Sequence, residues 1–377
     1  IGGRDMDYWF AQAIGQPVSV RHQLQALREE GARPRIVVAA GHGVYFHAKY
    51  KWTTQRQKVN GILEDDITQI FARELSAASE GNGADPIRLR GGEVGLLHEP
   101  SGKLWPSVAA RYFLENWRPN QPEIWNSKPD STDPRREMHQ DIRSRPLFAN
   151  LISADAIAHL HTNADLPSAT GTRILVHPGR PTDLRLATLA LCSMKELIHS
   201  DAKYATYNVP LSPSLIRDKG ENSFAKVPSM IVEVGFHTNV DDAKLLQNPE
   251  FQKLSMRGLA KGMRLFREGA SCAPFVIQPR QPVTANIGKD AWVPVAISGN
   301  PVYPVDIQVS QLNCGSVKCR RTLKLVHSKK EADAYRFNHF CWRGDENAPI
   351  EFRIEAKDLE GVWTPPVTYQ VKCIKPS

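Results

Sequence analysis

Four side chains in the first two thirds of the sequence could together hydrolyse an amide bond. His42 follows a short apolar run and lies between two glycines, Glu64 opens an amphipathic stretch, and His161 lies near the end of another apolar run. Two imidazoles and one carboxylate are a ligand set typical of catalytic zinc, and they leave a fourth position for water. We therefore predict that these three residues bind one zinc ion per chain.

Each of these ligands also has an ordinary structural interpretation. A histidine after glycine is commonly a turn residue, and Glu64 precedes Asp65 and Asp66, either of which would be its substitute. Alternation along a strand puts His159 on the same side as His161. Spacing alone therefore does not choose between these alternatives.

A fourth group, Glu233, lies inside the apolar run at residues 229–236. An unpaired carboxylate is costly to bury, so Glu233 needs a partner. A metal with its water would supply one, and apolar surroundings would raise the carboxyl pKa far enough for proton transfer near neutral pH. We predict that Glu233 is the catalytic carboxylate, the alternative being a structural ion pair with an arginine.

The elements that must hold these residues alternate between apolar runs and amphipathic stretches. Apolar runs predict strands, and apolar positions at helical spacing predict helices. We expect strands at 35–40, 86–90, 155–163, 171–177 and 229–236, and helices at 62–78, 142–153, 183–199 and 241–268. This is an α/β fold with a mixed, largely parallel sheet covered by helices. Loop residues at the strand ends would then share one cleft.

The chain divides into segments of different composition. Residues 1–33 contain two helix-like stretches and are predicted to be a helical lead-in to a catalytic domain at 34–269. Residues 91–140 are rich in Pro, Trp and Asn and have little periodicity, so we interpret them as an insertion that serves as a lid or as a substrate-contacting arm. Residues 274–377 contain about seven short strands, which predicts an Ig-like or fibronectin-like β-sandwich that serves as a binding or spacer domain.

The net charge and the hydropathy of the chain limit the classes of partner that we expect. The 377 residues carry a formal net charge of +8, from 48 basic and 40 acidic side chains. Diffuse positive charge suits a polyanion such as a cell wall, but no run of five or six basic residues marks a nucleic-acid site, so we expect no nucleic-acid partner. No apolar window of about 18 residues exists, so no transmembrane segment is expected, and no signal peptide is visible.

Cysteine usage indicates an oxidising compartment. Four of the six cysteines fall near the end of the chain, and their spacing lacks the paired CxxC pattern of structural zinc sites. Disulfides among Cys314, Cys319, Cys341 and Cys373 are therefore favoured, with three pairings open. Cys192 lies in an apolar pattern and is predicted to be a buried thiol.

Taken in order, these pieces resemble the zinc-dependent N-acetylmuramoyl-L-alanine amidases of bacterial cell walls, over about residues 34–266. The most specific match is the family's Val-Glu-Xaa-Gly-Phe-Xaa-Xaa-Asn element, which carries the catalytic Glu and corresponds to residues 232–239. The family's zinc ligands match His42, Glu64 and the histidine of His161-Thr-Asn. A further arginine-containing element is echoed by Arg90, residues 141–150 and Asp155. The long gap between His42 and Glu64, and a histidine at 159 where the family has serine, depart from the pattern.

The resemblance implies hydrolysis of the amide between N-acetylmuramoyl residues and L-alanine in peptidoglycan stem peptides. It implies a periplasmic or extracellular enzyme, with a protein activator as a further candidate partner. Asn163 and Asn239 would either contact the peptide or tie down loops. Two alternatives stay open: a zinc peptidase or carboxypeptidase acting on stem peptides, although the His-Glu-Xaa-Xaa-His pattern of many such enzymes is absent, and a non-catalytic wall-binding protein.

Overall fold

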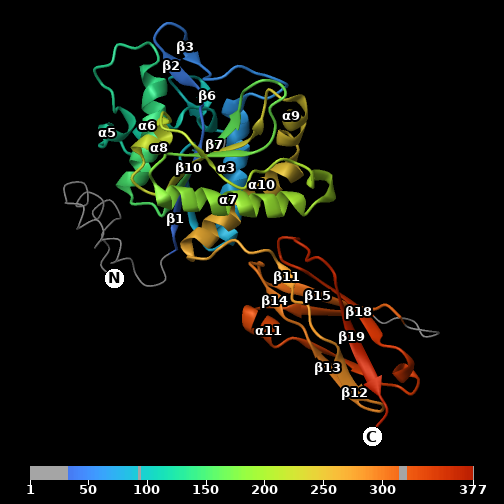
Figure 1. Cartoon of the computed structure of the whole chain (residues 1–377). Helices are drawn as coiled ribbons and strands as arrows, with labels where there is room; N and C mark the ends of the chain where they lie inside the picture. The colour runs from blue at the N-terminus through green and yellow to red at the C-terminus, as the bar shows by residue number, and fades with distance from the viewer. Residues whose placement is uncertain (1–32, 92–94, 314–320, 377) are drawn as a thin grey trace, which may run out of the picture. The chain divides into compact units, whose positions relative to one another are not determined.

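A computed structural model describes residues 33–91, 95–313 and 321–376 (Figure 1). The chain forms two compact units that divide between Ser271 and Cys272. The helical lead-in predicted for residues 1–33 lies outside the described residues, apart from Arg33 at its end. Within the described ranges, no helix is both long and apolar enough to cross a membrane.

A six-stranded sheet forms the centre of the first unit. Its strands follow the order β4 (Asp85–Arg88), β1 (Arg35–Ala40), β7 (Ala156–Asn163), β10 (Ser229–Phe236), β8 (Arg173–Val176) and β9 (Ser214–Leu215). All neighbouring pairs are parallel except β10 and β8, which run antiparallel. The predicted mixed, largely parallel sheet covered by helices is therefore confirmed.

Helices cover both faces of this sheet because its strands are apolar on both sides. Ile36, Val38 and Ala40 of β1 pack into the cluster that includes α3 (Glu64–Gly81), α7 (Pro181–His199) and α10 (Pro249–Arg267). Val37 and Ala39 belong to the opposite cluster, with α4 (Ala110–Trp117), α5 (Pro122–Trp125) and α6 (Arg136–Leu151). By the same alternation, Leu160 and Val232 face the first cluster, so His161 and Glu233 lie on the α6 side.

Helices α7 and α10, which lie side by side in Figure 1, approach closely at two glycines. A Cβ atom added at Gly258 would lie 2.5 Å from Met194 Cα, and one added at Gly262 would lie 2.5 Å from Ala190 Cα. Both neighbours are backbone atoms, which cannot rotate away. The two helices can therefore pack at this distance only while both positions lack a side chain.

Gly262→Ala should lower the free energy of unfolding by about 1–3 kcal/mol, because the new methyl group forces the helices apart. Gly81→Ala is the matched control, since Gly81 ends helix α3 and an added Cβ there meets no atom within 4 Å. That variant should match the parent or be slightly more stable. Urea titration of both variants checks this, and equal midpoints would contradict the packing argument.

Two predicted segments differ from the structure. The single helix expected at 241–268 is two helices, α9 (Val240–Leu246) and α10, because Asn248 caps the second helix and Pro249 begins it. The insertion at 91–140 contains the hairpin β5 (Leu97–His98) and β6 (Lys103–Leu104), the turn η1 (Trp105–Ser107), and helices α4 and α5 before α6 begins. These elements are too short to give a periodic sequence signal.

Shorter elements complete the first unit. They are the hairpin of β2 (Tyr45–His47) and β3 (Lys51–Thr53), the turn η2 (Ala202–Tyr204), and the one-turn helix α8 (Gly220–Phe224) just before β10.

The second unit is built from antiparallel β-structure, as the sequence predicts. A five-stranded sheet has the order β12 (Val283–Asn286), β19 (Val367–Ile374), β18 (Ile350–Lys357), β15 (Val305–Gln311) and β16 (Arg321–Val326), with only β12 and β19 parallel. The unit also contains two separate two-stranded sheets: β11 (Val276–Ile277) with β14 (Ile297–Ser298), and β13 (Asp290–Pro294) with β17 (Arg336–Phe340). The short helices α11 (Lys329–Asp333) and η3 (Asp345–Asn347) lie between strands.

The cysteines of the described residues are oxidised. Cys341 and Cys373 form a disulfide, which fits the prediction for the end of the chain, whereas Cys314 and Cys319 lie outside the described residues. Cys192 and Cys272 are also disulfide-bonded. The buried thiol predicted at Cys192 is therefore wrong, because that side chain is only partly buried and its sulfur is oxidised.

Candidate metal centre

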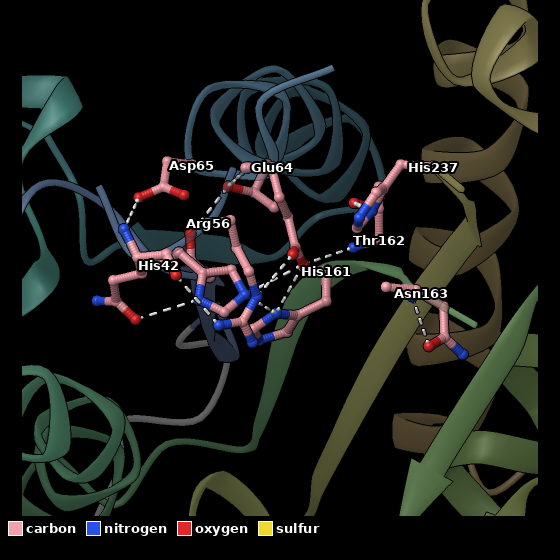
Figure 2. Close-up of polar contacts among 12 residues, drawn as sticks. His42, Arg56, Glu64, Asp65, His161, Thr162, Asn163 and His237 are labelled. Atoms are coloured by element: carbon pink, nitrogen blue, oxygen red, sulfur yellow. Dashed lines mark hydrogen bonds and ion pairs between the residues drawn. The ribbon is translucent and has the colours of Figure 1, made fainter. Parts of the chain in front are cut away.

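Three of the predicted site residues meet at the carboxyl ends of β1 and β7 (Figure 2). Glu64 Oε1 lies 3.1 Å from His42 Nε2 and 3.2 Å from His161 Nδ1, and the two ring nitrogens are 3.1 Å apart. All three residues are buried. Three donors from distant segments thus form a nearly equilateral triangle.

The turn after β1 aims His42 at this point through an unusual backbone conformation. His42 has a φ of 60°, in the left-handed region that side chains other than glycine seldom adopt, and Gly43 follows with a φ of 114°. Such conformations cost of order 1–3 kcal/mol and persist only where the surroundings impose them. Here the carboxylate of Asp65 accepts the Gly43 N–H at 3.0 Å.

Gly41 and Arg90 fix the remainder of that turn. A Cβ atom at Gly41 would lie 2.3 Å from Cε1 of His161, so only glycine leaves room for the imidazole. The buried Arg90 guanidinium donates to Gly41 O at 2.7 Å and to Val108 O at 3.1 Å. Arg90, which the sequence matched to a family arginine, therefore holds the loop that carries His42.

Glu64 is held ionised at the start of α3. Burial by itself would raise the pKa of its carboxyl, but His42 and His161 hold that pKa well below its usual range. Glu64 Oε1 also accepts the backbone N–H of Thr162 at 2.9 Å, and the half-exposed Arg56 lies 3.4 Å from Oε2. One carboxylate oxygen is thus directed at the two imidazoles.

The opposite ring nitrogen of His161 contacts a carboxylate that the sequence did not reveal. Glu221, in α8, places Oε1 3.2 Å from His161 Nε2. Burial disfavours a charged His161, yet the hydrogen bonds with Glu221 and Glu64 raise the pKa of this imidazole to about 10. The centre therefore stabilises a positive charge between its carboxylates.

A chain of hydrogen bonds runs behind the triangle from one histidine to the other. Glu221 pairs with Arg145 at 3.2 Å, and Arg145 pairs with Asp141 at 3.1 Å. Gln55 then donates to Asp141 at 3.2 Å and lies 3.1 Å from Nδ1 of His42 through its amide oxygen. One mostly buried network thus contacts the second ring nitrogen of each histidine and fixes the orientation of both imidazoles, as is usual for metal-ligating histidines.

Glu233 lies on β10 beside the triangle, in register with His161 on β7. Burial, together with the charges of Glu64 and Glu221, outweighs the opposing effect of His161 and raises the pKa of Glu233 to about 7. Its buried Oε2 has no hydrogen-bond partner among the described residues. The ion-pair alternative, with an arginine neutralising this carboxylate, therefore has no support in the described contacts.

The other candidate residues from the sequence lie outside the triangle. His159 is fully buried, and neither of its ring nitrogens has a described partner. Burial lowers the pKa of this imidazole to about 3, so the side chain is neutral. It contributes no atom to the triangle. Asp65 accepts the N–H groups of Gly43 and Gln55, and Asp66 is exposed.

The two asparagines and Asp155 tie down backbone instead of facing the triangle. Asn239 caps α9, Asn163 accepts the N–H of Ala164, and Asp155 accepts the N–H of Arg35 at the start of β1. A further buried histidine, His237, contacts the Thr162 hydroxyl at 2.9 Å through Nδ1 (Figure 2).

The donor set fits a zinc ion. Two donors bound tetrahedrally to zinc at about 2.0–2.1 Å lie roughly 3.3–3.4 Å apart, close to the separations of the three atoms here. Glu233, whose Oε2 has no partner among the described residues, pairs in register with His161, and a catalytic zinc site needs a proton acceptor near its open fourth position. A second cluster, His339, Asp345 and Cys373, does not qualify, because Cys373 is in a disulfide.

Comparison with known proteins assigns the fold around this centre to a family. The family model described as N-acetylmuramoyl-L-alanine amidase matches residues 36–264, which include the whole triangle and Glu233. The chain belongs to the N-acetylmuramoyl-L-alanine amidase family. It is therefore a hydrolase of peptidoglycan, and the resemblance drawn from the sequence is confirmed.

The solved structures to which part of this chain is similar include several amidases. The CwlD amidase from Clostridioides difficile, solved in complex with the GerS lipoprotein, is 18% identical, with 63% of this chain and all of that chain aligned at a TM-score of 0.43. AmiC2 of Nostoc punctiforme is 15% identical over 63% of this chain and 98% of its own, at a TM-score of 0.42. A search of curated proteins gives no significant match.

Proposed function

We propose that this amidase binds one zinc ion through His42, Glu64 and His161 and uses Glu233 to move protons between water and the leaving nitrogen. The observation that carries the proposal is the triangle of three buried donors 3.1–3.2 Å apart. The bond cleaved is the amide joining the N-acetylmuramoyl lactyl group to L-alanine. When bound, zinc would polarise that carbonyl and lower the pKa of a water molecule.

The protein groups have separate tasks in this reaction. Glu233, with a pKa raised to about 7, takes a proton from the attacking water and later delivers it to the departing alanine nitrogen. Thr162 and the network behind the histidines hold the ligand atoms in place. Because Glu233 Oε2 has no described partner, it can accept that proton without first breaking a hydrogen bond.

We also propose that the enzyme works in the periplasm or outside the cell. Disulfides persist in oxidising compartments, and the Cys341–Cys373 bond together with oxidised Cys192 and Cys272 supports such a location. Its substrate, peptidoglycan, lies in the same space. The C-terminal unit would then bind the wall or act as a spacer, the role predicted for 274–377.

The deciding experiment measures soluble products released from purified peptidoglycan. Mass spectrometry should find intact stem peptides for the parent chain, none after chelation, and recovery after zinc is added back. A peptidase would instead cut within the stems, and a wall-binding protein would release nothing. Either of those product patterns from zinc-loaded protein would refute the proposed reaction.

The carboxylate of Glu221 provides a test of ligand orientation. Glu221→Gln should weaken zinc affinity about 10–100-fold, because the neutral amide holds His161 Nε2 less firmly and leaves Arg145 less compensated. Competition against a chromogenic chelator measures the affinity directly, without reference to turnover.

Glu137→Gln is the matched control for that measurement. Glu137 also pairs with a buried arginine, Arg111 at 2.9 Å, but it has no described contact with the histidine network. Its substitution should leave zinc affinity unchanged. Equal affinities for both variants would mean that Glu221 does not orient the ligand.

A further inference from the structure

The insertion between β4 and α6 helps to form a pocket of about 630 Å³. Its aromatic lining comes from the hairpin of β2 and β3, from η1 and from α4: Phe46, Trp52, Trp105 and Tyr112. Figure 1 shows β2, β3 and β6 gathered at the same end of the first unit. This pocket is therefore formed jointly by the insertion and by the long segment between His42 and Glu64.

Sequence proximity and one hydrogen bond connect the pocket with the metal centre. Phe46 follows His42 by four residues, so their Cα atoms are at most about 14 Å apart. Arg111, another lining residue, donates its backbone N–H to Asp141 at 3.3 Å, and Asp141 belongs to the network that orients His42. Three residues of extended peptide span about 10 Å, a length of the same order as this upper limit.

The charges in the pocket are unbalanced. Glu99, Glu115 and Glu137 line it together with a single guanidinium, that of Arg111. Burial and Arg111 lower the pKa of the pocket histidine, His98, so it is uncharged at neutral pH. The lining therefore carries an excess of two negative charges.

Existing contacts offset only part of this excess, since Arg136, outside the lining, lies 3.4 Å from Glu137. Arg111 is engaged with Glu137 at 2.9 Å and with the Trp125 carbonyl at 3.2 Å, and lies only 3.7 Å from Glu115. Burial raises the pKa of Glu115, and Glu137 raises it further against the opposing effect of Arg111. Glu115 is thus a carboxylate that a bound cation would stabilise.

The aromatic rings favour the same kind of ligand. Trp52 packs against His98 and Tyr112 with ring centroids 5.3 and 5.1 Å away, so the cluster holds its rings in fixed orientations. Aromatic faces attract ammonium groups, and Lys51 already places its Nζ 5.5 Å from the Phe46 ring centroid. Aromatic rings in a lining that holds more carboxylates than guanidinium groups favour a cationic ligand.

We propose that this pocket binds a primary ammonium group on the peptide part of the substrate, the side chain of a diamino acid. The inference rests on the proposed function, since it assumes that the stem peptide extends from the metal centre. The pocket selects the peptide to be cleaved by pairing the ammonium with Glu115 and enclosing it with aromatic rings. Acetylation of that amine removes both interactions.

Calorimetry with zinc-loaded Glu233→Gln protein tests this without turnover. The probes are a synthetic N-acetylmuramoyl tripeptide ending in lysine and the same compound with an Nε-acetylated lysine. We expect the free amine to bind about tenfold more tightly. Adding Glu115→Gln should reduce that ratio below about threefold while leaving binding of the acetylated probe unchanged, which also shows that the pocket remains folded.

Glu123→Gln is the matched control, because Glu123 is exposed on α5 of the same insertion and does not line the pocket. It should keep the full preference. A ratio near one in the Glu233→Gln protein, or an unchanged ratio after Glu115→Gln, overturns the inference, as does failure to bind either probe. Stem-peptide release by the parent is scored separately, so a parent that cleaves without this preference refutes only the pocket assignment.

Discussion

Glu233→Gln should lower kcat for stem-peptide release by about 10²–10⁴-fold while zinc stays bound. Glutamine has nearly the same shape but cannot take a proton from water, and proton transfer by a positioned carboxylate contributes an effect of this size. Single-turnover release from purified peptidoglycan, with zinc content measured on the same sample, checks the prediction. Parent-like turnover would show that another group carries the proton.

The same substitution should stabilise the metal-free protein, because ionised Glu233 is costly to bury. The folded pKa of about 7 lies above the ordinary value of 4.5, so the folded state keeps its proton longer than the unfolded state. Below about pH 4.5 both states are protonated and the cost is absent; it grows between pH 4.5 and 7 and is complete above 7. Glu233→Gln should therefore gain up to about 3 kcal/mol at pH 8 and little at pH 4.5. Urea titrations at both pH values measure the difference.

His161→Ala should abolish stoichiometric zinc binding and with it stem-peptide release. His161 contacts both other donors, at 3.1 and 3.2 Å, so its loss leaves only two ligands and a Glu64 that is less fully compensated. Metal analysis after dialysis should fall from about one zinc per parent chain to below about one tenth. Added zinc at 100 times its Kd should stabilise the parent by about 2.7 kcal/mol and leave the variant unchanged.

His159→Leu provides the control from the same strand. His159 is buried two residues before His161 and contributes no donor to the triangle. The variant should keep one zinc per chain and remain active. Loss of zinc from His159→Leu but not from His161→Ala would reverse the assignment of these two histidines.

Much of the fold, and the convergence of His42, Glu64 and His161, could be predicted because the signals are local. The run at 36–40 alternates between the two core clusters, so each of its residues is apolar, and the strand is recognisable without its neighbours. Strands β7 and β10, which carry His161 and Glu233, are also mostly apolar. Once these strands are parallel neighbours, their carboxyl ends must converge, which brings the predicted residues together.

The parts that could not be predicted depend on contacts between distant segments. Glu221 lies in a helix of five residues with no periodic pattern, and its role depends on meeting His161 and Arg145, 60 and 76 residues away. Gln55 belongs to an irregular stretch and reaches Asp141 across 86 residues. The pocket likewise could not be predicted from the sequence, since the rings that line it come from separate short elements.

The ligand spacing also determines when the metal can be acquired. His42 and His161 are separated by 119 residues, and Glu64 lies 97 residues before His161, so the three donors are far apart in an unfolded chain. A metal bound to all three acts as a cross-link that closes these long loops, and its binding energy adds to the stability of the folded state. Binding of a metal by all three donors would therefore follow the assembly of β1 beside β7, so the unfolded chain would not hold the ion at this centre.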